Sequence, residues 1–271
     1  MHPLTVQQLL EKRDRTSIQT WMPFWEWVYQ VYFRVQTSGW EHVPSGKVLF
    51  VGSHNGGLAA PDLYMFMVDW FRRFGYDRLI YGLMHRKVWQ VNPQAADYAA
   101  RLGAVPAEAK VAIAALHQGA SVLVYPGGAQ DVFRPHSQRN QIHLANRKGF
   151  IKLALRENVP IVPLVAHGAH DTLIVLGDLY KQLKQLNEWG LLPWWRDIDP
   201  EVFPIYLGLP WGVALGPLPN IPLPAQIYTH VCKPVRFERY GRESAQDLAY
   251  VDKCYERVEQ AMQAALDNLA K

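Results

Sequence analysis

Cysteine is nearly absent from this sequence of 271 residues, in which Cys232 and Cys254 occur without the paired spacing of a metal site. A disulfide framework is therefore excluded as the organising feature, and a reducing compartment is expected. Charged residues are also few, at 19%, and the net charge of +4 is too small to indicate a nucleic-acid partner. This balance still suits an anionic membrane surface or an anionic substrate.

The motifs of several enzyme classes are missing. The sequence has no Gly-x-Ser-x-Gly elbow of a serine hydrolase and no Gly-x-Gly-x-x-Gly or Walker loop for a nucleotide. The segment His167-Gly168-Ala169-His170-Asp171 contains metal-ligating residue types, but it lacks the i, i+4 histidine spacing of zinc hydrolases. We therefore expect neither a metal nor a cofactor.

Long uninterrupted apolar runs are lacking too. The apolar stretch 18–33 contains Pro23 and Glu26, and residues 202–229 carry no charge but hold six prolines. Neither suits a lipid-exposed helix, and the polar first fifteen residues do not look like a secretory signal. Tryptophan is abundant, and eight of the ten residues fall into two groups: Trp21, Trp25, Trp27 and Trp40, then Trp189, Trp194, Trp195 and Trp211.

Tryptophan favours the boundary between membrane and water. We therefore expect a peripheral protein on the cytoplasmic side of a membrane, with a Trp-rich soluble core as the alternative.

Helical and strand-like segments alternate along the chain, which is typical of α/β proteins with a buried parallel sheet. Expected helices begin at Thr5 and Ser244 and cover 24–35, 62–74, 94–102, 108–118 and 148–157. Expected strands cover 47–52, 79–83, 121–125, 159–166 and 231–237. This order predicts a single α/β domain (39–271) with a largely parallel central sheet flanked by helices, preceded by an N-terminal helical arm (1–38).

The last expected helix carries an apolar stripe at helical spacing, which indicates a face docked on the body of the protein. Its members are Leu248, Val251, Tyr255, Val258, Met262, Ala265 and Leu269.

The strongest signal for chemistry is the segment Ser53-His54-Asn55-Gly56-Gly57-Leu58-Ala59-Ala60-Pro61-Asp62. A histidine follows an expected strand, glycines permit a sharp turn, and an aspartate opens the next helix. A carboxylate on one imidazole nitrogen fixes the tautomer and prepares the other to accept a proton. His54 and Asp62 are thus a candidate general base and its partner, although Asp62 could equally be a helix cap.

Further blocks follow in order. They are Gly103-Ala104-Val105-Pro106, Tyr125-Pro126-Gly127-Gly128-Ala129-Gln130-Asp131, Arg147-Lys148-Gly149-Phe150 and Val159-Pro160-Ile161-Val162-Pro163-Leu164. From about Gly39 to Pro234 the chain resembles the glycerolipid acyltransferase superfamily, which includes the lysophosphatidic-acid acyltransferases. It is most similar to the group with a Pro-Gly-Gly block, which includes diacylglycerol acyltransferases and phytyl ester synthases.

The resemblance implies direct transfer of a fatty acyl group from acyl-CoA or acyl-carrier protein to a lipid hydroxyl, without an acyl-enzyme. His54 matches the catalytic histidine of the family and Asp62 its partner. Backbone N–H groups near Gly127 and Gly128 are candidate donors to the oxyanion.

Two positions depart from the usual family pattern. The aspartate stands eight residues after the histidine rather than five, a spacing that occurs in the Pro-Gly-Gly relatives. Where relatives often carry an arginine for an acceptor phosphate, this chain has Gln130-Asp131, and a neutral amide cannot neutralise a phosphate. Either Arg134 or Arg147, the latter with Lys148, takes that role, or the acceptor has no phosphate.

We expect an acyltransferase of phospholipid biosynthesis that acts on lysophosphatidate or a related lysophospholipid. One alternative is a neutral acceptor, either diacylglycerol or a long-chain alcohol such as phytol. Others are a lipid-binding membrane module without turnover and a hydrolase that releases the acyl group as free fatty acid.

Overall fold

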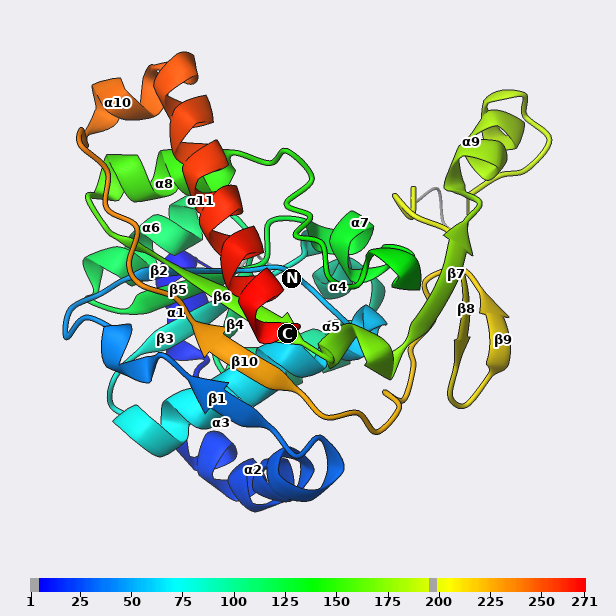
Figure 1. The fold of residues 1–271 in the computed structure, drawn as a ribbon, viewed down its shortest axis with the longest axis horizontal. Helices are drawn as coiled ribbons and strands as arrows, with labels where there is room; N and C mark the ends of the chain where they lie inside the picture. Colours follow the sequence, from blue (N-terminus) through cyan, green and yellow to red (C-terminus); the bar gives the residue numbers. More distant parts are fainter. Residues whose placement is uncertain (1–4, 195–198) are drawn as a thin grey trace.

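A central sheet organises the protein, for which a computed structural model describes residues 5–194 and 199–271 (Figure 1). Within these residues the sheet has seven strands in the order β1-β10-β6-β2-β5-β3-β4. In chain order they are β1 Gln36–Ser38, β2 Leu49–Gly52, β3 Ile80–Met84, β4 Ala104–Pro106, β5 Ser121–Val124, β6 Ile161–His167 and β10 Tyr228–Val231. The predicted α/β class with a largely parallel sheet is confirmed.

Five neighbouring strands, β6, β2, β5, β3 and β4, run parallel, whereas β10 and β1 run the other way. The carboxyl ends of parallel strands meet at one edge of a sheet, where ligand sites of open α/β sheets form. The segments after β2, β5 and β6, which begin at Ser53, Tyr125 and Gly168, therefore emerge close together.

Helices cover both faces of this sheet because side chains along each buried strand point alternately to either face. On β2, Leu49 and Val51 join the core below α1 Val6–Glu11, α6 Ala109–His117, α8 Gly149–Glu157 and α11 Leu248–Leu269. Phe50 joins the opposite core, formed with α2 Arg15–Trp27, the π-helix Val28–Tyr32 and α3 Pro61–Phe74. Figure 1 shows α11 crossing one face of the sheet and α3 lying beyond the other.

The remaining helical segments connect these layers. They are α4 Arg86–Val91, α5 Pro93–Arg101, α7 Gly128–Val132, α9 Tyr180–Glu188 and α10 Arg242–Gln246, with short 3-10 turns at Trp40–His42, Gly57–Ala59, His136–Gln138 and Ala169–Thr172.

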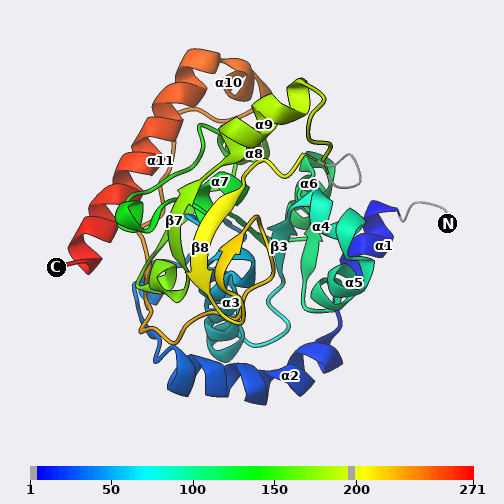
Figure 2. The same ribbon diagram turned by 90° about the vertical axis from the view of Figure 1, so that its right-hand side faces the viewer.

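A second, antiparallel sheet follows β6 and consists of β7 Ile174–Asp178, β8 Pro204–Gly208 and β9 Gly212–Leu215. In Figure 1 this sheet lies to the right of the main body with α9 above it, and in Figure 2 it faces the viewer. The sequence analysis took the region 202–229 only as proline-rich and missed β8 and β9. Their prolines occupy the first residue of β8 and the turn after it, where the missing N–H does not interrupt pairing.

The helix expected over 24–35 differs from the one observed, because α2 begins nine residues earlier at Arg15. Asp14 caps α2 by accepting hydrogen bonds from the N–H groups of Thr16 and Ser17. Pro23 lies inside α2 without ending it, and the helix continues as the π-helix to Tyr32.

The final helix, in contrast, begins later than expected. Ser244 lies in the separate short helix α10, and Asp247 caps α11 with its side chain on the N–H of Tyr250. Val258 and Met262 in the predicted stripe are fully buried, whereas Leu248 is 65% exposed. Leu248 is the first residue of α11, so it lies beyond the part of the helix that the body covers. The strand expected over 231–237 ends at Val231, and only Val235 pairs further along, with Ile161.

We predict that Met262→Ala lowers the free energy of unfolding by about 2–5 kcal/mol, because it removes a fully buried side chain and leaves a cavity. Leu248→Ala, on the same helix, should change it by less than about 0.5 kcal/mol. Urea unfolding followed by circular dichroism measures both values. Equal effects of the two substitutions would contradict the docking of α11.

Candidate active site

The loop between β2 and α3 folds back on itself and brings His54 to Asp62. Three of its residues, Gly56, Gly57 and Ala60, have left-handed backbones, with φ of 75°, 67° and 45°. For an alanine this conformation is strained, and such strain is concentrated at functional sites. The reversal leaves 3.5 Å between His54 Nδ1 and Asp62 Oδ1.

Asp62 is held in place by its own hydrogen bonds. Its Oδ1 accepts from the N–H of Leu63 at 2.9 Å, and its Oδ2 accepts from the side-chain amide of Asn55 at 3.2 Å. The Asp62 side chain is 3% exposed, whereas that of His54 is 19% exposed. Because Nδ1 of His54 faces the carboxylate, Nε2 is the nitrogen left to act on a substrate.

Tyr125, the first residue after β5, packs against the imidazole. The ring centroids of Tyr125 and His54 lie 4.7 Å apart. The Tyr125 ring also occupies the space that a Cβ on Gly52 would need, so only glycine fits at the end of β2. Burial, together with the nearby carboxylates of Asp62 and Asp131, raises the pKa of Tyr125 well above its usual value, which keeps the phenol neutral.

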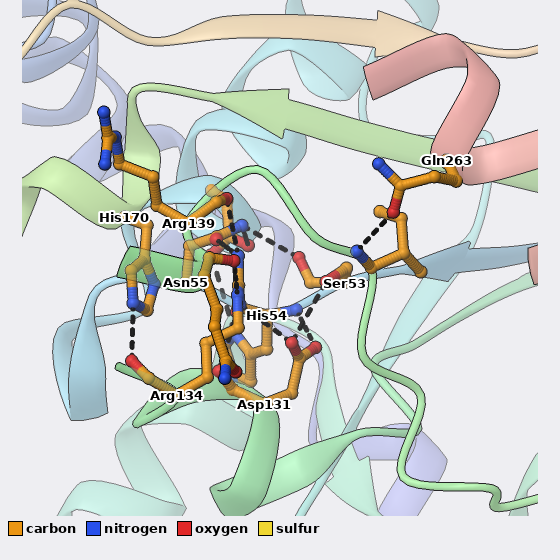
Figure 3. Close-up of polar contacts among 11 residues, drawn as sticks. Ser53, His54, Asn55, Asp131, Arg134, Arg139, His170 and Gln263 are labelled. Atoms are coloured by element: carbon orange, nitrogen blue, oxygen red, sulfur yellow. Dashed lines mark hydrogen bonds and ion pairs between the residues drawn. The ribbon is translucent and has the colours of Figure 1, made fainter. Parts of the chain in front are cut away.

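A buried ion pair lies behind the histidine loop (Figure 3). Asp131, in α7, accepts hydrogen bonds from the backbone N–H of His54 and from the hydroxyl of Ser53, the latter at 3.1 Å. Arg134 donates to Asp131 Oδ1 at 2.8 Å, and both side chains are at most 3% exposed. Burial raises the pKa of Asp131 to about 6, although Arg134 and the two donors favour its ionised form.

Arg134 uses every donor group of its guanidinium on protein acceptors. Nη1 donates to the carbonyl of His54 at 2.7 Å, and Nη2 donates to the side chain of Asn55 at 2.6 Å. The carbonyls of Asp131, Gln138 and Arg139 accept the remaining hydrogen bonds. The geometry therefore gives Arg134 the task of holding residues 54 and 55, rather than leaving it free for a phosphate.

The Pro-Gly-Gly turn follows Tyr125 directly. The N–H of Gly128 donates to the carbonyl of Tyr125 at 3.3 Å and closes the turn. That amide is already engaged, so the N–H of Gly127 is the better candidate for contact with an oxyanion. The guanidinium of Arg147 lies against Gly128 and donates to the carbonyl of Pro126 at 3.3 Å.

The structure separates Arg147 from Lys148, which the sequence analysis grouped. Lys148 points to α11 and pairs with Asp252 at 2.7 Å. Arg147 Nη2 lies 3.4 Å from Glu201, and Glu201 also binds Lys87 at 2.8 Å. Among the sequence-predicted cations, Arg147 is thus the one beside the Pro-Gly-Gly turn, with a carboxylate already next to it.

His170, which follows β6, is bonded through Nε2 to the carbonyl of Arg134 at 2.9 Å, and burial lowers its pKa to about 3. Asp171 pairs with His136 at 2.7 Å. In the described part of the chain, no group of three His, Cys, Asp or Glu side chains is arranged to hold a metal ion.

A small cavity lies beside the pair and is lined by polar and apolar side chains, among them Ser53, Asp62, Tyr125 and Thr229. Thr229, on β10, is 4% exposed, and its hydroxyl has no hydrogen-bond partner among the residues that the structure describes. Asn55, Asp131 and Tyr125 were not predicted as site residues. For Asp131 the signal is the spacing Asp131-x-x-Arg134 after the glycines, which permits an i, i+3 ion pair within one turn.

We predict that Arg134→Met lowers the free energy of unfolding by about 3–5 kcal/mol, because it leaves Asp131 buried without its counter-charge. The double substitution Asp131→Asn with Arg134→Met should cost less than the sum of the two single substitutions. Urea unfolding of the wild type and the three variants measures this coupling. If the free energy of unfolding of Arg134→Met is within about 1 kcal/mol of the wild-type value, the pair does not stabilise the histidine loop.

The fold has a counterpart among solved structures. The crystal structure of the 1-acyl-sn-glycerophosphate (LPA) acyltransferase PlsC from Thermotoga maritima matches 93% of this chain and 79% of that one, with a TM-score of 0.55. Sequence identity over the match is 15%, so the likeness concerns the fold alone.

Similar sequences come from bacteria and animals. An uncharacterised protein of Mycobacterium tuberculosis is 27% identical over 248 residues, which are 91% of this chain and 64% of that protein. The 2-acylglycerol O-acyltransferase 1 of Mus musculus is 24% identical over 250 residues, 88% of this chain and 70% of that protein. The diacylglycerol O-acyltransferase 2 of Bos taurus is 28% identical over 144 residues, covering 48% and 35%. The chain thus spans about two thirds or less of these relatives.

The family model named diacylglycerol acyltransferase matches residues 79–264, which is more than half of the chain. Its range includes the Pro-Gly-Gly turn, the Asp131–Arg134 pair and most of α11. By this match, and within the glycerolipid acyltransferase superfamily that its motifs indicate, the chain belongs to the diacylglycerol acyltransferase family.

Proposed function

We propose that this protein transfers a fatty acyl group from a thioester donor, acyl-CoA or acyl-carrier protein, to a hydroxyl of a neutral glycerolipid. The observation that carries the proposal is the His54–Asp62 pair, placed after a central parallel strand in a chain of this family. A mono- or diacylglycerol is the acceptor class that the names of the relatives support.

In the proposed reaction His54 Nε2 removes the proton of the acceptor hydroxyl while that oxygen attacks the thioester carbonyl carbon. The new carbon–oxygen bond forms, and the carbon–sulfur bond of the tetrahedral intermediate then breaks. The departing thiolate takes the proton from the imidazolium. Asp62 keeps the Nδ1 hydrogen toward itself and stabilises the imidazolium charge. No covalent acyl-enzyme is needed.

The surrounding residues have supporting roles in this scheme. The N–H of Gly127 donates to the developing oxyanion. Tyr125 limits rotation of the imidazole by packing on its face. Arg134 and Asp131 act as positioning residues, since they fix the backbone on either side of the His54 side chain.

The charges around the site support a neutral acceptor over lysophosphatidate, which the sequence analysis ranked first. Arg134 is committed to the histidine loop, Arg147 lies beside Glu201, and Lys148 pairs with Asp252. A phosphate would have to compete with a carboxylate for each of these ion-paired cations. A neutral headgroup needs no such exchange.

A lipid acceptor requires access to a membrane, and we propose a peripheral attachment on the cytoplasmic side. No helix in the described ranges is long and apolar enough to cross a bilayer. Of the N-terminal tryptophans, Trp21 and Trp27 are exposed, whereas Trp25 stacks on Tyr64. In the second group, Trp195 lies outside the described residues, and Trp189 and Trp211 are exposed.

We predict that His54→Ala lowers kcat/KM by about 10²–10⁴-fold through loss of the general base. Asp62→Asn should lower kcat to a similar degree with little change in KM for the acceptor, because the imidazole loses its orientation and charge support. Transfer of labelled palmitate from its CoA and carrier-protein thioesters to diacylglycerol measures both. His136→Ala, near the loop but outside the pair, serves as the control. Near wild-type turnover of either variant would remove that residue from the proposed mechanism.

We predict further that diacylglycerol or monoacylglycerol accepts the acyl group faster than lysophosphatidate does. Arg147→Glu should then change kcat/KM for the neutral acceptor by less than about 3-fold, since no ion pair with the acceptor is lost. Arg156→Glu, on an exposed part of α8, controls for charge alone. If lysophosphatidate acylation is instead the main activity, and Arg147→Glu selectively abolishes it, the assignment of a neutral acceptor is reversed. Thioester cleavage that needs no acceptor would indicate a hydrolase.

A further inference from the structure

The small antiparallel sheet has an unusual composition on its outward face. Its inward face is ordinary, because Val175, Tyr206 and Ala214 are buried there against Leu173 and Phe133. A sheet with one packed face normally turns polar side chains outward. Here the outward side chains that the register sets are Ile174, Ile205, Leu207, Val213 and Leu215, with Gly177 opposite Ile205. Leu176, at the bulge of β7, is 60% exposed.

The strand register assembles these side chains into one surface. Ile174 on β7 pairs with Leu207 on β8, which pairs with Val213 on β9, so three aliphatic side chains form a row across the sheet. Ile205 and Leu215 form the next row. Val213 is 68% exposed, and no residue between 202 and 229 is charged. In Figure 2, β7 and β8 lie on the side of the molecule that faces the viewer.

The turn between β8 and β9 extends this surface. Leu209 and Trp211 are 45% and 54% exposed. The indole N–H of Trp211 donates to the carbonyl of Pro219 at 2.7 Å. The one polar atom of this side chain is therefore already satisfied, and the ring can enter an apolar medium without losing a hydrogen bond.

Segments that flank this sheet contact the histidine loop. A Cβ on Gly57 would lie 2.6 Å from Leu173, which precedes β7, and 2.8 Å from the side chain of Asn220, which follows β9. The Asn220 side chain also donates to the carbonyl of Gly56 at 3.2 Å. Leu58, the next residue of the loop, is 50% exposed, so the loop beside the sheet also presents an apolar side chain to its surroundings.

We propose that the outward face of the β7–β8–β9 sheet docks on a lipid bilayer and sets the histidine loop against it. The proposal rests on the proposed function, because a glycerolipid acceptor lies in a bilayer. The face carries no side-chain hydrogen-bonding group, whereas protein interfaces have about one hydrogen bond per 100–200 Å². Leucine, which supplies three of the six aliphatic side chains, is also under-represented among protein-binding hot spots.

The open edge of the sheet limits how deeply the face enters. In the order β7-β8-β9, β9 is an edge strand that has no further strand partner among the described residues. Unpaired backbone groups are not tolerated in hydrocarbon. The face therefore rests at the boundary between headgroups and acyl chains, the depth at which tryptophan is favoured.

Sedimentation with phosphatidylcholine vesicles, with and without diacylglycerol, tests the proposal. Leu207→Ser with Val213→Ser removes two side chains of one row and should weaken vesicle binding by about 100-fold. Leu248→Ser, at an exposed leucine of α11 away from this sheet, should leave binding unchanged. Because the face is uncharged, raising the salt concentration should not release the protein.

His54→Ala separates this proposal from the proposed function: it should bind vesicles like wild type although its acyl transfer falls by about 10²–10⁴-fold. Leu176→Ser with Leu215→Ser provides an independent pair on the same face, and thermal melting checks that each variant is folded. Unchanged vesicle binding by both folded pairs overturns the proposal. So does release by salt, or a dimer, detected by light scattering, that the substitutions dissociate while vesicle binding persists.

Discussion

The buried ion pair between Asp131 and Arg134 is the interaction on which the site depends. Each member bonds to the backbone of His54, Asp131 to its N–H and Arg134 to its carbonyl. The pair therefore ties α7, which follows β5, to the loop that follows β2. Two parallel strands bring these segments together, and the pair fixes the start of a loop whose left-handed backbones persist only when their surroundings impose them.

Much of the fold follows from the sequence. Apolar runs such as 47–52, 121–125 and 159–166 are buried on both faces and lie between helices, so their pattern predicts parallel central strands. The small sheet does not follow from this pattern, because it is apolar on both faces although only one face is packed. Prolines at the start of β8 and in the turn after it also hide its strands. The start of α2 depends on a cap by Asp14, ahead of a helix whose apolar pattern is weak before Trp21.

The site was predictable in part. The approach of His54 to Asp62 follows from a glycine-containing turn ahead of a helix, and the structure shows it. The different fates of Arg134, Arg147 and Lys148 do not follow from sequence, because all three are cations in one stretch of chain. What separates them is tertiary: Arg134 lies inside the protein, Arg147 faces the Pro-Gly-Gly turn, and Lys148 faces α11.

The histidine loop is anchored through the main chain of His54, so that the backbone and the side chain of this residue are held by different contacts. The amide and carbonyl of His54 are both held by buried charges, while its imidazole lies between Asp62 and the ring of Tyr125. These two contacts limit rotation of the ring as it gains and loses a proton, and the backbone that places it is held independently of them. Substitutions that alter the side chain of residue 54 leave the backbone conformation of the loop in place, whereas a change at residue 131 or 134 alters that conformation itself.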